Sequence, residues 1–254
     1  MATRATREAQ PAPERYLVCG CTPWTKDVFD RVLSKLPGAW EYVDLPRNWR
    51  RIVAEGPRPR YAFFLHWRWK VPADVLAAVE CVGFHLGTLQ YERGGSPLQW
   101  RILAGQHRAT LSMFRMTEQL DWGPMWPSGE VHLEGPAETC YRRVMTEAAG
   151  LIDLLLQTPE AGRGPHPIAG LRGDGAAEGK VWPRRTPGES NLARPGAGSL
   201  AALYDRIRCV DAPGYPLAYL RFPGFRVEFR RAVNYGDRIE ADVTITRDEE
   251  TDPA

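Results

Sequence analysis

No apolar run in the 254-residue chain approaches the roughly 18 residues that a membrane-spanning helix needs. Residues 1–14 are polar and contain no apolar stretch typical of a secretion signal, so we expect a cytoplasmic protein with no membrane partner. Excess basic charge is also missing, because 33 basic side chains are balanced by 31 acidic ones. Without a basic surface to neutralise phosphates, a nucleic-acid partner is not expected.

Cysteine is scarce, and its five copies are odd in number and lie within or beside apolar stretches. This pattern predicts buried thiols rather than a disulfide framework. Cys19 and Cys21 flank a glycine and could together hold a metal ion. No second pair of cysteines or histidines stands at ligand spacing, however, so the sequence predicts no metal site.

The first part of the chain alternates between short apolar runs and stretches with helical spacing, which favours an α/β fold with a mostly parallel sheet. Ligands bind at the carboxyl ends of strands in such sheets. His66 and His85 each fall at such an end. We expect strands at 15–20, 40–45, 61–66, 81–85, 110–117 and 130–133, and helices at 25–36, 48–55, 72–80, 97–104 and 136–157.

Residues 159–180 are rich in glycine and proline and lack periodicity, which is typical of a linker or a long loop. We therefore predict a domain at 15–158 and a second, β-rich subdomain at 181–247. We expect a helix at 200–210 in that subdomain, followed by strands at 218–222, 225–233 and 239–246.

Polar residues with potential chemistry follow two of these strands. His85 comes first, then Arg93-Gly94-x-x-Pro97, and then Asp121-x-Gly123-Pro124. Taken singly, such a histidine is more often structural, and an aspartate two residues before a glycine is an ordinary turn residue. Their order resembles the active-site signature of the folate-dependent formyltransferases. The resemblance is to the methionyl-tRNA formyltransferase-like and sugar N-formyltransferase-like branch, and it extends over roughly residues 15 to 246.

This resemblance implies a Rossmann-like N-terminal domain that binds 10-formyltetrahydrofolate and a barrel-like C-terminal subdomain. It also implies catalytic roles for His85 and Asp121. Formyl transfer to an amine requires a group that accepts the amine proton and donors that stabilise the oxyanion. In the family, Asp and His manage the proton, while Asn and His donate to the oxyanion.

One part of the family signature is missing. Gly83 stands where the family has Asn, and the loop 87–92 and Trp100 also depart from the nearest branch. Loss of one oxyanion donor costs on the order of 10²–10³ in rate. Thr88, Gln99 or a backbone N–H could replace it, and the sequence does not choose among them.

Aromatic and apolar residues near the motifs are candidates for contact with the cofactor, because flat rings stack well on a pterin. Plain core packing is an equal alternative for Phe64. The cofactor candidates are Phe64, His66, Trp67, Trp69, Val71, Met116, Leu120 and Trp122.

Four arginines and a tyrosine are candidates for binding an anionic acceptor. Arg93 is also expected to shape its glycine-containing loop. For the others, ordinary surface charge explains the residues equally well. The candidates are Arg93, Arg184, Arg185, Tyr204 and Arg208.

Three functional hypotheses follow. The first is a formyltransferase that acts on the amine of a small acceptor, such as an amino sugar or a natural-product intermediate. The second keeps the folate site but changes the reaction, for example to hydrolysis of 10-formyltetrahydrofolate or another one-carbon transfer. The third is a non-catalytic binding protein. A homodimer is compatible with all three.

Overall fold

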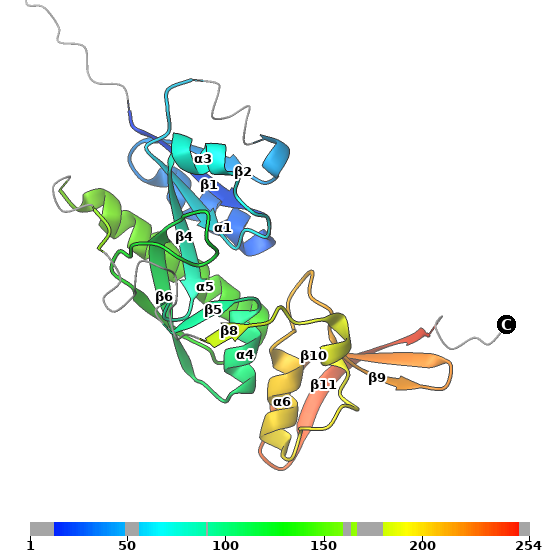
Figure 1. The fold of residues 1–254 in the computed structure, drawn as a ribbon. Coiled ribbons are helices and arrows are strands. Elements are labelled where there is room, and N and C mark those ends of the chain that lie inside the picture. The colour runs from blue at the N-terminus through cyan, green and yellow to red at the C-terminus, as the bar shows by residue number, and fades with distance from the viewer. Residues whose placement is uncertain (1–12, 49–55, 90, 160–163, 167–179, 249–254) are drawn as a thin grey trace, which may run out of the picture. The chain divides into compact units, whose positions relative to one another are not determined.

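The structure is a computed structural model that describes residues 13–48, 56–89, 91–159, 164–166 and 180–248 (Figure 1). The chain falls into two compact units that divide between Val82 and Gly83. This division lies inside the predicted 15–158 domain. The linker predicted at 159–180 stays a prediction, because most of it lies outside the described residues.

The first unit contains a parallel arrangement of three strands in the order β2-β1-β3. β1 forms parallel pairs with both of its neighbours. The elements are β1 (Arg15–Gly20), α1 (Pro23–Arg31), the 3-10 helix η1 (Leu33–Lys35), β2 (Ala39–Val43), β3 (Tyr61–Leu65) and α3 (Ala73–Ala78).

Burial explains why these residues form a parallel sheet core. All five residues of β3 are buried, as expected for a strand covered on both faces. At the carboxyl end of β1, Thr22 and Thr25 form a reciprocal capping box and Pro23 occupies the first turn of α1. Strand β1 therefore passes directly into a helix, and the strand ends remain available for ligand contacts.

The second unit begins within β4 (Glu80–Leu86) and contains two further sheets. Strands β4, β6 and β7 lie in that order in the larger sheet, and the two further sheets are β5-β8 and β11-β10-β9. The other elements are β5 (Glu92–Gly94), α4 (Pro97–Leu103), β6 (Arg108–Arg115), β7 (Gly129–His132), α5 (Ala137–Gln157), β8 (Lys180–Trp182), the 3-10 helix η3 (Pro187–Ser190), α6 (Leu200–Arg208), β9 (Ala218–Phe222), β10 (Phe225–Asn234) and β11 (Ile239–Arg247).

Strand β6 runs antiparallel to β4, which departs from the parallel direction of the first unit. The Gly87 N–H donates to the Thr110 carbonyl at 2.7 Å. At the other end of the pair, a Cβ on Gly83 would lie 2.7 Å from the Phe114 ring. Residue numbers therefore rise along β4 while they fall along β6. The carboxyl end of β6 lies away from that of β4, so residues that follow β6 must turn back to reach His85.

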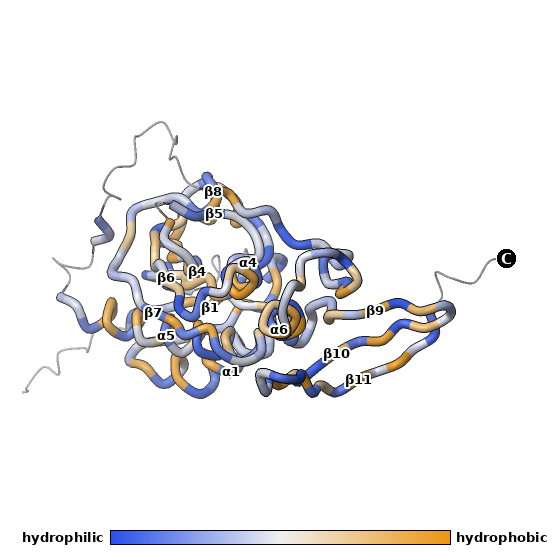
Figure 2. Tube along the Cα trace, turned by 90° about the horizontal axis from the view of Figure 1, so that it is seen from below, coloured by the Kyte–Doolittle hydropathy of each residue, from blue (hydrophilic) through white to orange (hydrophobic). Residues whose placement is uncertain are grey.

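The C-terminal part forms a three-stranded antiparallel sheet in the order β11-β10-β9, with α6 packed against β10. Apolar and polar residues alternate along these strands (Figure 2). In the strand register, Phe225 lies opposite Phe222 and Val227 lies opposite Ile245, so these apolar side chains share one face. Phe222, Phe225 and Ile245 are exposed. This is the β-rich C-terminal unit that the sequence predicts.

Most predicted elements are confirmed within one to five residues at their ends. The two three-residue strands β5 and β8 were not predicted, because a strand this short has no measurable periodicity. The helix expected at 48–55 lies, apart from Asn48, outside the described residues. Among the described residues, no helix has both the length and the apolar character needed to cross a membrane.

Arg208, one of the predicted acceptor-binding residues, instead joins α6 to the segment between β7 and α5. Its side chain is 6% exposed and its Nε donates to Asp205 Oδ1 at 2.6 Å. Its Nη1 donates to the carbonyls of Leu133 and Gly135. The guanidinium lies 5.5 Å from the Tyr204 ring, so both residues have a structural contact of their own.

Replacing Arg208 with Met should destabilise the protein by about 3 kcal/mol, because it leaves a partly buried carboxylate and two carbonyls without their donor. Equilibrium unfolding in urea measures the effect. The control is Arg230→Met, which removes an exposed arginine from β10. Equal stabilities of the two variants would contradict the structural role of Arg208.

Candidate active site

His85 lies near the carboxyl end of β4 and is only 5% exposed. Alternate residues of a strand share a face, so His85 and Gly83 face the same side. The Nε2 atom of His85 is buried and has no hydrogen-bond partner among the described residues. Buried polar atoms are nearly always paired, so an unpaired nitrogen at a strand end indicates a group kept for a ligand.

Asp121 reaches His85 because the chain reverses direction after β6. The Arg115 N–H donates to the Pro124 carbonyl at 2.8 Å, which closes the loop that carries Asp121. Asp121 itself has a φ of +48°, in the left-handed region that aspartate tolerates better than most residues. Its Oδ2 accepts a hydrogen bond from the Gly94 N–H at 3.0 Å and lies 3.6 Å from His85 Nδ1. The structure therefore brings the two predicted catalytic residues together.

The charge state of His85 depends on opposing influences. Burial is the largest and lowers the pKa of His85, because a charged imidazolium is poorly solvated there. The Asp121 carboxylate raises this pKa, the Arg101 guanidinium lowers it, and Glu92 raises it through its charge and a backbone hydrogen bond. The net effect is a lowered pKa of His85, which favours a neutral imidazole.

The position of the missing family Asn is filled from β6. A Cβ built on Gly83 would lie 2.7 Å from the Phe114 ring and 3.0 Å from Met116 Cγ. Real Cβ atoms do not approach other atoms so closely, and Phe114 is itself 4% exposed. An Asn side chain therefore does not fit at residue 83 in this packing. The departure seen in the sequence is a repacked core position, with an aromatic ring where the family has an amide.

The two side chains predicted as replacement oxyanion donors have different environments. Thr88 lies in a turn in which its carbonyl accepts the N–H groups of Tyr91 and Glu92. Gln99 is 1% exposed, and its Nε2 donates to Tyr141 Oη at 2.9 Å. The side-chain amide of Gln99 is thus held by Tyr141 on α5, and none of its described contacts links it to His85.

The cofactor candidates of the first unit cluster around His66 at the end of β3. Trp24 Nε1 donates to His66 Nδ1 at 2.9 Å, and the φ of His66 is +49°. Trp67 contacts both Phe64 and Trp69 with ring centroids 5.8 and 4.8 Å apart. Val71 is buried nearby in the sequence. The result is an aromatic cluster at the strand end, while Phe64 itself is 4% exposed and packs in the core.

The remaining cofactor candidates belong to the second unit. Met116 lies close to Gly83, since a Cβ built on Gly83 would be 3.0 Å from Met116 Cγ. Leu120 is 77% exposed and lies next to Asp121. Arg93, a predicted acceptor contact, places its guanidinium 5.2 Å from the Trp122 ring. All four residues therefore lie around the Asp121 loop.

The other two predicted acceptor arginines lie beside β8. Arg184 is exposed. The guanidinium of Arg185 lies 5.3 Å from the Trp100 ring and donates to the Glu189 carbonyl at 2.8 Å. Nothing in these contacts links either residue to His85, so their role in acceptor binding stays a prediction.

Two charged residues beside His85 were missed by the sequence analysis. Arg101 on α4 forms an ion pair with Glu92 on β5, and the Arg101 side chain is 8% exposed. One signal was available, because Arg101 stands between the buried residues Leu98 and Ile102 on the apolar side of a predicted helix. A charged residue on such a face needs a partner of opposite charge, because an unpaired buried charge is costly.

The described residues contain no group of three or more histidine, cysteine or acidic side chains that could hold a metal ion. Four of the five cysteines are buried and all are free thiols, which confirms the expectation of buried thiols for those four. Burial raises the pKa of the Cys81 thiol to about 12, which keeps it protonated and unreactive.

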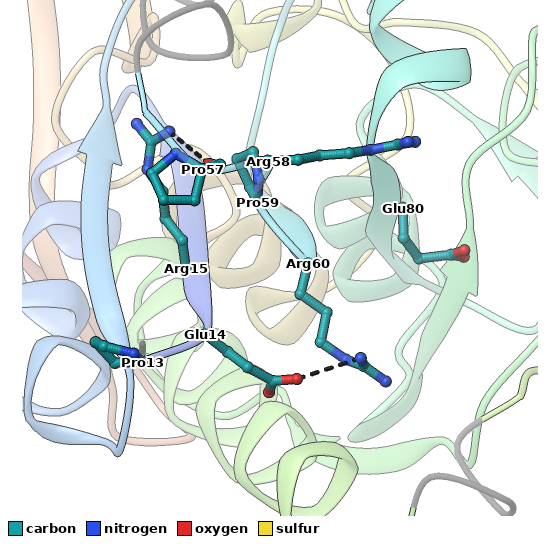
Figure 3. Close-up of a pocket in the computed structure, with 8 residues that line it drawn as sticks. All are labelled: Pro13, Glu14, Arg15, Pro57, Arg58, Pro59, Arg60 and Glu80. Atoms are coloured by element: carbon teal, nitrogen blue, oxygen red, sulfur yellow. Dashed lines mark hydrogen bonds and ion pairs between the residues drawn. The ribbon is translucent and has the colours of Figure 1, made fainter. Parts of the chain in front are cut away.

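A separate hollow of about 480 Å³ opens at the amino-terminal ends of β1 and β3 (Figure 3). Its charged residues interact with one another or with backbone groups. Arg60 pairs with Glu14 at 3.2 Å, and Arg15 donates to the Pro57 carbonyl at 3.1 Å. The hollow lies at the strand ends opposite His66, so it is not the predicted folate site.

Comparisons with known proteins agree with the geometry. A sequence profile of the methionyl-tRNA formyltransferase C-terminal domain matches residues 187–246. The solved structure of methionyl-tRNA formyltransferase from Clostridium thermocellum superposes with a TM-score of 0.77 at 26% identity, covering 92% of this chain and 100% of that one. The chain therefore resembles the formyltransferases in its C-terminal sequence and in its fold.

Curated relatives come from both branches of this family. Methionyl-tRNA formyltransferase from Phenylobacterium zucineum is 35% identical over 97 residues, which are 37% of this chain and 32% of that protein. The dTDP-4-amino-4,6-dideoxyglucose formyltransferase of Mycobacterium bovis is 29% identical over 123 residues, which are 47% of this chain and 50% of that protein. The chain spans about a third and a half, respectively, of the length of these two relatives.

Restoring the family residue with Gly83→Asn should lower the melting temperature by several degrees and leave activity no higher, because the new side chain collides with Phe114. Thermal unfolding followed by circular dichroism measures the effect. Adding Phe114→Ala should make the Asn substitution less costly than it is alone, since the two positions share one space.

Gly150→Asn is the matched control, because a Cβ at this helical glycine would meet nothing within 4 Å. We expect little change in its melting temperature. A Gly83→Asn protein as stable as the Gly150→Asn protein would refute the repacking of residue 83.

Proposed function

We propose that the protein transfers a formyl group from 10-formyltetrahydrofolate to the amine of a small acceptor. The observation that carries this proposal is the buried pair formed by His85 and Asp121. The unpaired Nε2 of His85 and the Asp121 carboxylate, which the Gly94 N–H holds in place, suit a reaction that removes a proton from an amine. The likeness to formyltransferases in sequence and fold supports the choice of a folate-borne formyl donor.

Asp121, Gly94 and His85 each have a separate proposed role. The bound folate supplies an activated formyl carbon. Asp121 accepts the proton that the acceptor nitrogen loses as its bond to that carbon forms. The Gly94 N–H keeps the carboxylate oriented, because Oδ2 is fixed by a 3.0 Å hydrogen bond. His85, uncharged and buried, leaves the lone pair of its Nε2 free to accept a hydrogen bond from the acceptor amine and so to orient it. The proton held by Asp121 then returns to the departing folate nitrogen.

The acceptor is proposed to be small, such as an amino sugar. A formal net charge of +2 gives little electrostatic attraction for a tRNA backbone. The likeness to a dTDP-sugar formyltransferase supports the same choice. The proposal includes a cytoplasmic location and leaves the oligomeric state to measurement.

The direct test incubates the purified full chain with 10-formyltetrahydrofolate and a panel of amines, with product masses read by mass spectrometry. The panel contains nucleotide-linked amino sugars, free amino acids and methionyl-tRNA. A formylated small amine supports the proposal. Formylated tRNA, free formate as the sole product, or no reaction despite folate binding would each overturn it.

Asp121→Asn should reduce kcat by about 10²–10⁴-fold, because the amide keeps the shape and the tolerated backbone angle but cannot accept the proton. His85→Gln should also lose most activity. Initial rates at saturating folate measure both effects, and calorimetry with tetrahydrofolate shows whether the cofactor still binds.

His107→Gln and Asp237→Asn are the controls, because both residues are exposed. We expect wild-type rates for these two proteins. Retention of full activity by Asp121→Asn would exclude the proposed role of the carboxylate.

A further inference from the structure

Beside the catalytic pair lies a buried cation whose nitrogens are all engaged. Arg101 extends from α4 to the end of β4, where its Nε donates to the Leu86 carbonyl at 3.2 Å. Its Nη1 donates to Gln106 Oε1 at 2.8 Å, and its Nη2 pairs with Glu92 Oε2. A buried guanidinium costs desolvation energy, so three fixed contacts for one side chain indicate a required position.

The guanidinium can approach His85 only because residue 87 has no side chain. A Cβ on Gly87 would lie 2.6 Å from Arg101 Nη2 and 3.1 Å from His85 Nε2. The Arg101 Nη2 and the unpaired edge of the imidazole therefore converge on the same point. Any larger residue at position 87 would displace the guanidinium, the ring or both.

The charged groups near His85 come from three elements. Asp121 approaches Nδ1 from the loop after β6, Glu92 contributes from β5, and Arg101 contributes from α4. The neighbouring β6 contributes a neutral group, since Ser112 Oγ donates to the Gly87 carbonyl at 2.7 Å. Two carboxylates thus favour an imidazolium, and one cation close to Nε2 opposes it.

We propose that Arg101, anchored by Glu92, is a positioning residue that keeps His85 uncharged with its proton on Nδ1. The proposal rests on the proposed function for its catalytic meaning. A cation beside Nε2 repels a proton there and attracts the lone pair. The single proton of the neutral ring then lies on Nδ1, the nitrogen that faces Asp121.

This arrangement has a chemical consequence for Asp121. A positively charged His85 would form a full ion pair with the carboxylate and make it a weaker proton acceptor. With Arg101 in place, the carboxylate faces a neutral ring and stays available for the acceptor's proton. Arg101 would therefore act on the reaction through His85 and Asp121, without contact with the reacting atoms.

The test follows the titration of His85 by NMR in the full chain labelled with ¹⁵N-histidine, and His85→Gln assigns the signal. Arg101→Met should move the His85 midpoint to higher pH, because the opposing cation is gone. Glu92→Gln should move it to lower pH, because a favourable carboxylate is gone while Leu86 and Gln106 still hold Arg101. Arg101→Lys, which keeps the charge, should restore most of the wild-type behaviour.

Opposite shifts for the two members of one ion pair are the distinguishing result, since a purely structural role predicts the same direction for both. The matched control is the exposed pair of Arg108 and Glu130, whose Nη1 and Oε1 atoms are 2.9 Å apart. Arg108→Met and Glu130→Gln should leave the His85 midpoint unchanged. A midpoint that stays in place or falls in Arg101→Met refutes the inference.

Two further measurements keep the result interpretable. If Arg101→Met does not fold, Gly87→Ala displaces the guanidinium with every charge retained and should also raise the midpoint; no change there would refute the inference. In the enzyme assay, the acidic limb of kcat should move to higher pH in Arg101→Met and to lower pH in Glu92→Gln, with KM little changed. The NMR shifts do not require turnover, so they can support the inference even if formyl transfer is not found.

Discussion

The burial of His85 at the end of β4 is the constraint on which the rest of the site depends. A buried imidazole is costly to charge, so its surroundings decide its protonation state. Asp121 stands at one nitrogen and is held there by a backbone N–H from the Arg-Gly segment. Arg101 stands near the other nitrogen. The elements that surround β4 can be understood as the means of holding these groups around one ring.

Two glycines make this packing possible. Gly83 leaves space for the Phe114 ring, and Gly87 leaves space for the Arg101 guanidinium. At residue 83 an apolar ring occupies the place of the family amide, and at residue 87 a buried cation lies beside the proposed catalytic histidine. The departures of the sequence from the family signature are thus physically linked. Each is a glycine in or just after β4 whose missing side chain leaves room for a large one from a neighbouring element.

Much of the fold followed from the sequence, because burial and periodicity are local signals. The apolar and aromatic residues at 61–66 predicted the strand β3, and the helical spacing at 136–157 predicted α5. The direction of β6 was not predictable in the same way, since an antiparallel neighbour has the same residue pattern as a parallel one. Arg208 was placed among acceptor contacts because its charge was visible in the sequence, while its burial against Leu133 was not.

The sequence by itself determined the chemistry available to this protein. His85, Asp121 and the Arg-Gly segment between them gave the resemblance to the formyltransferases and the two catalytic candidates, because the order of these residues is a property of the sequence. Tertiary structure alone decided what fills the place of the missing Asn and which charges surround His85. The reason is physical: Phe114 and Arg101 are 31 and 18 positions beyond Gly83 in the sequence, and only packing brings side chains so far apart into one space.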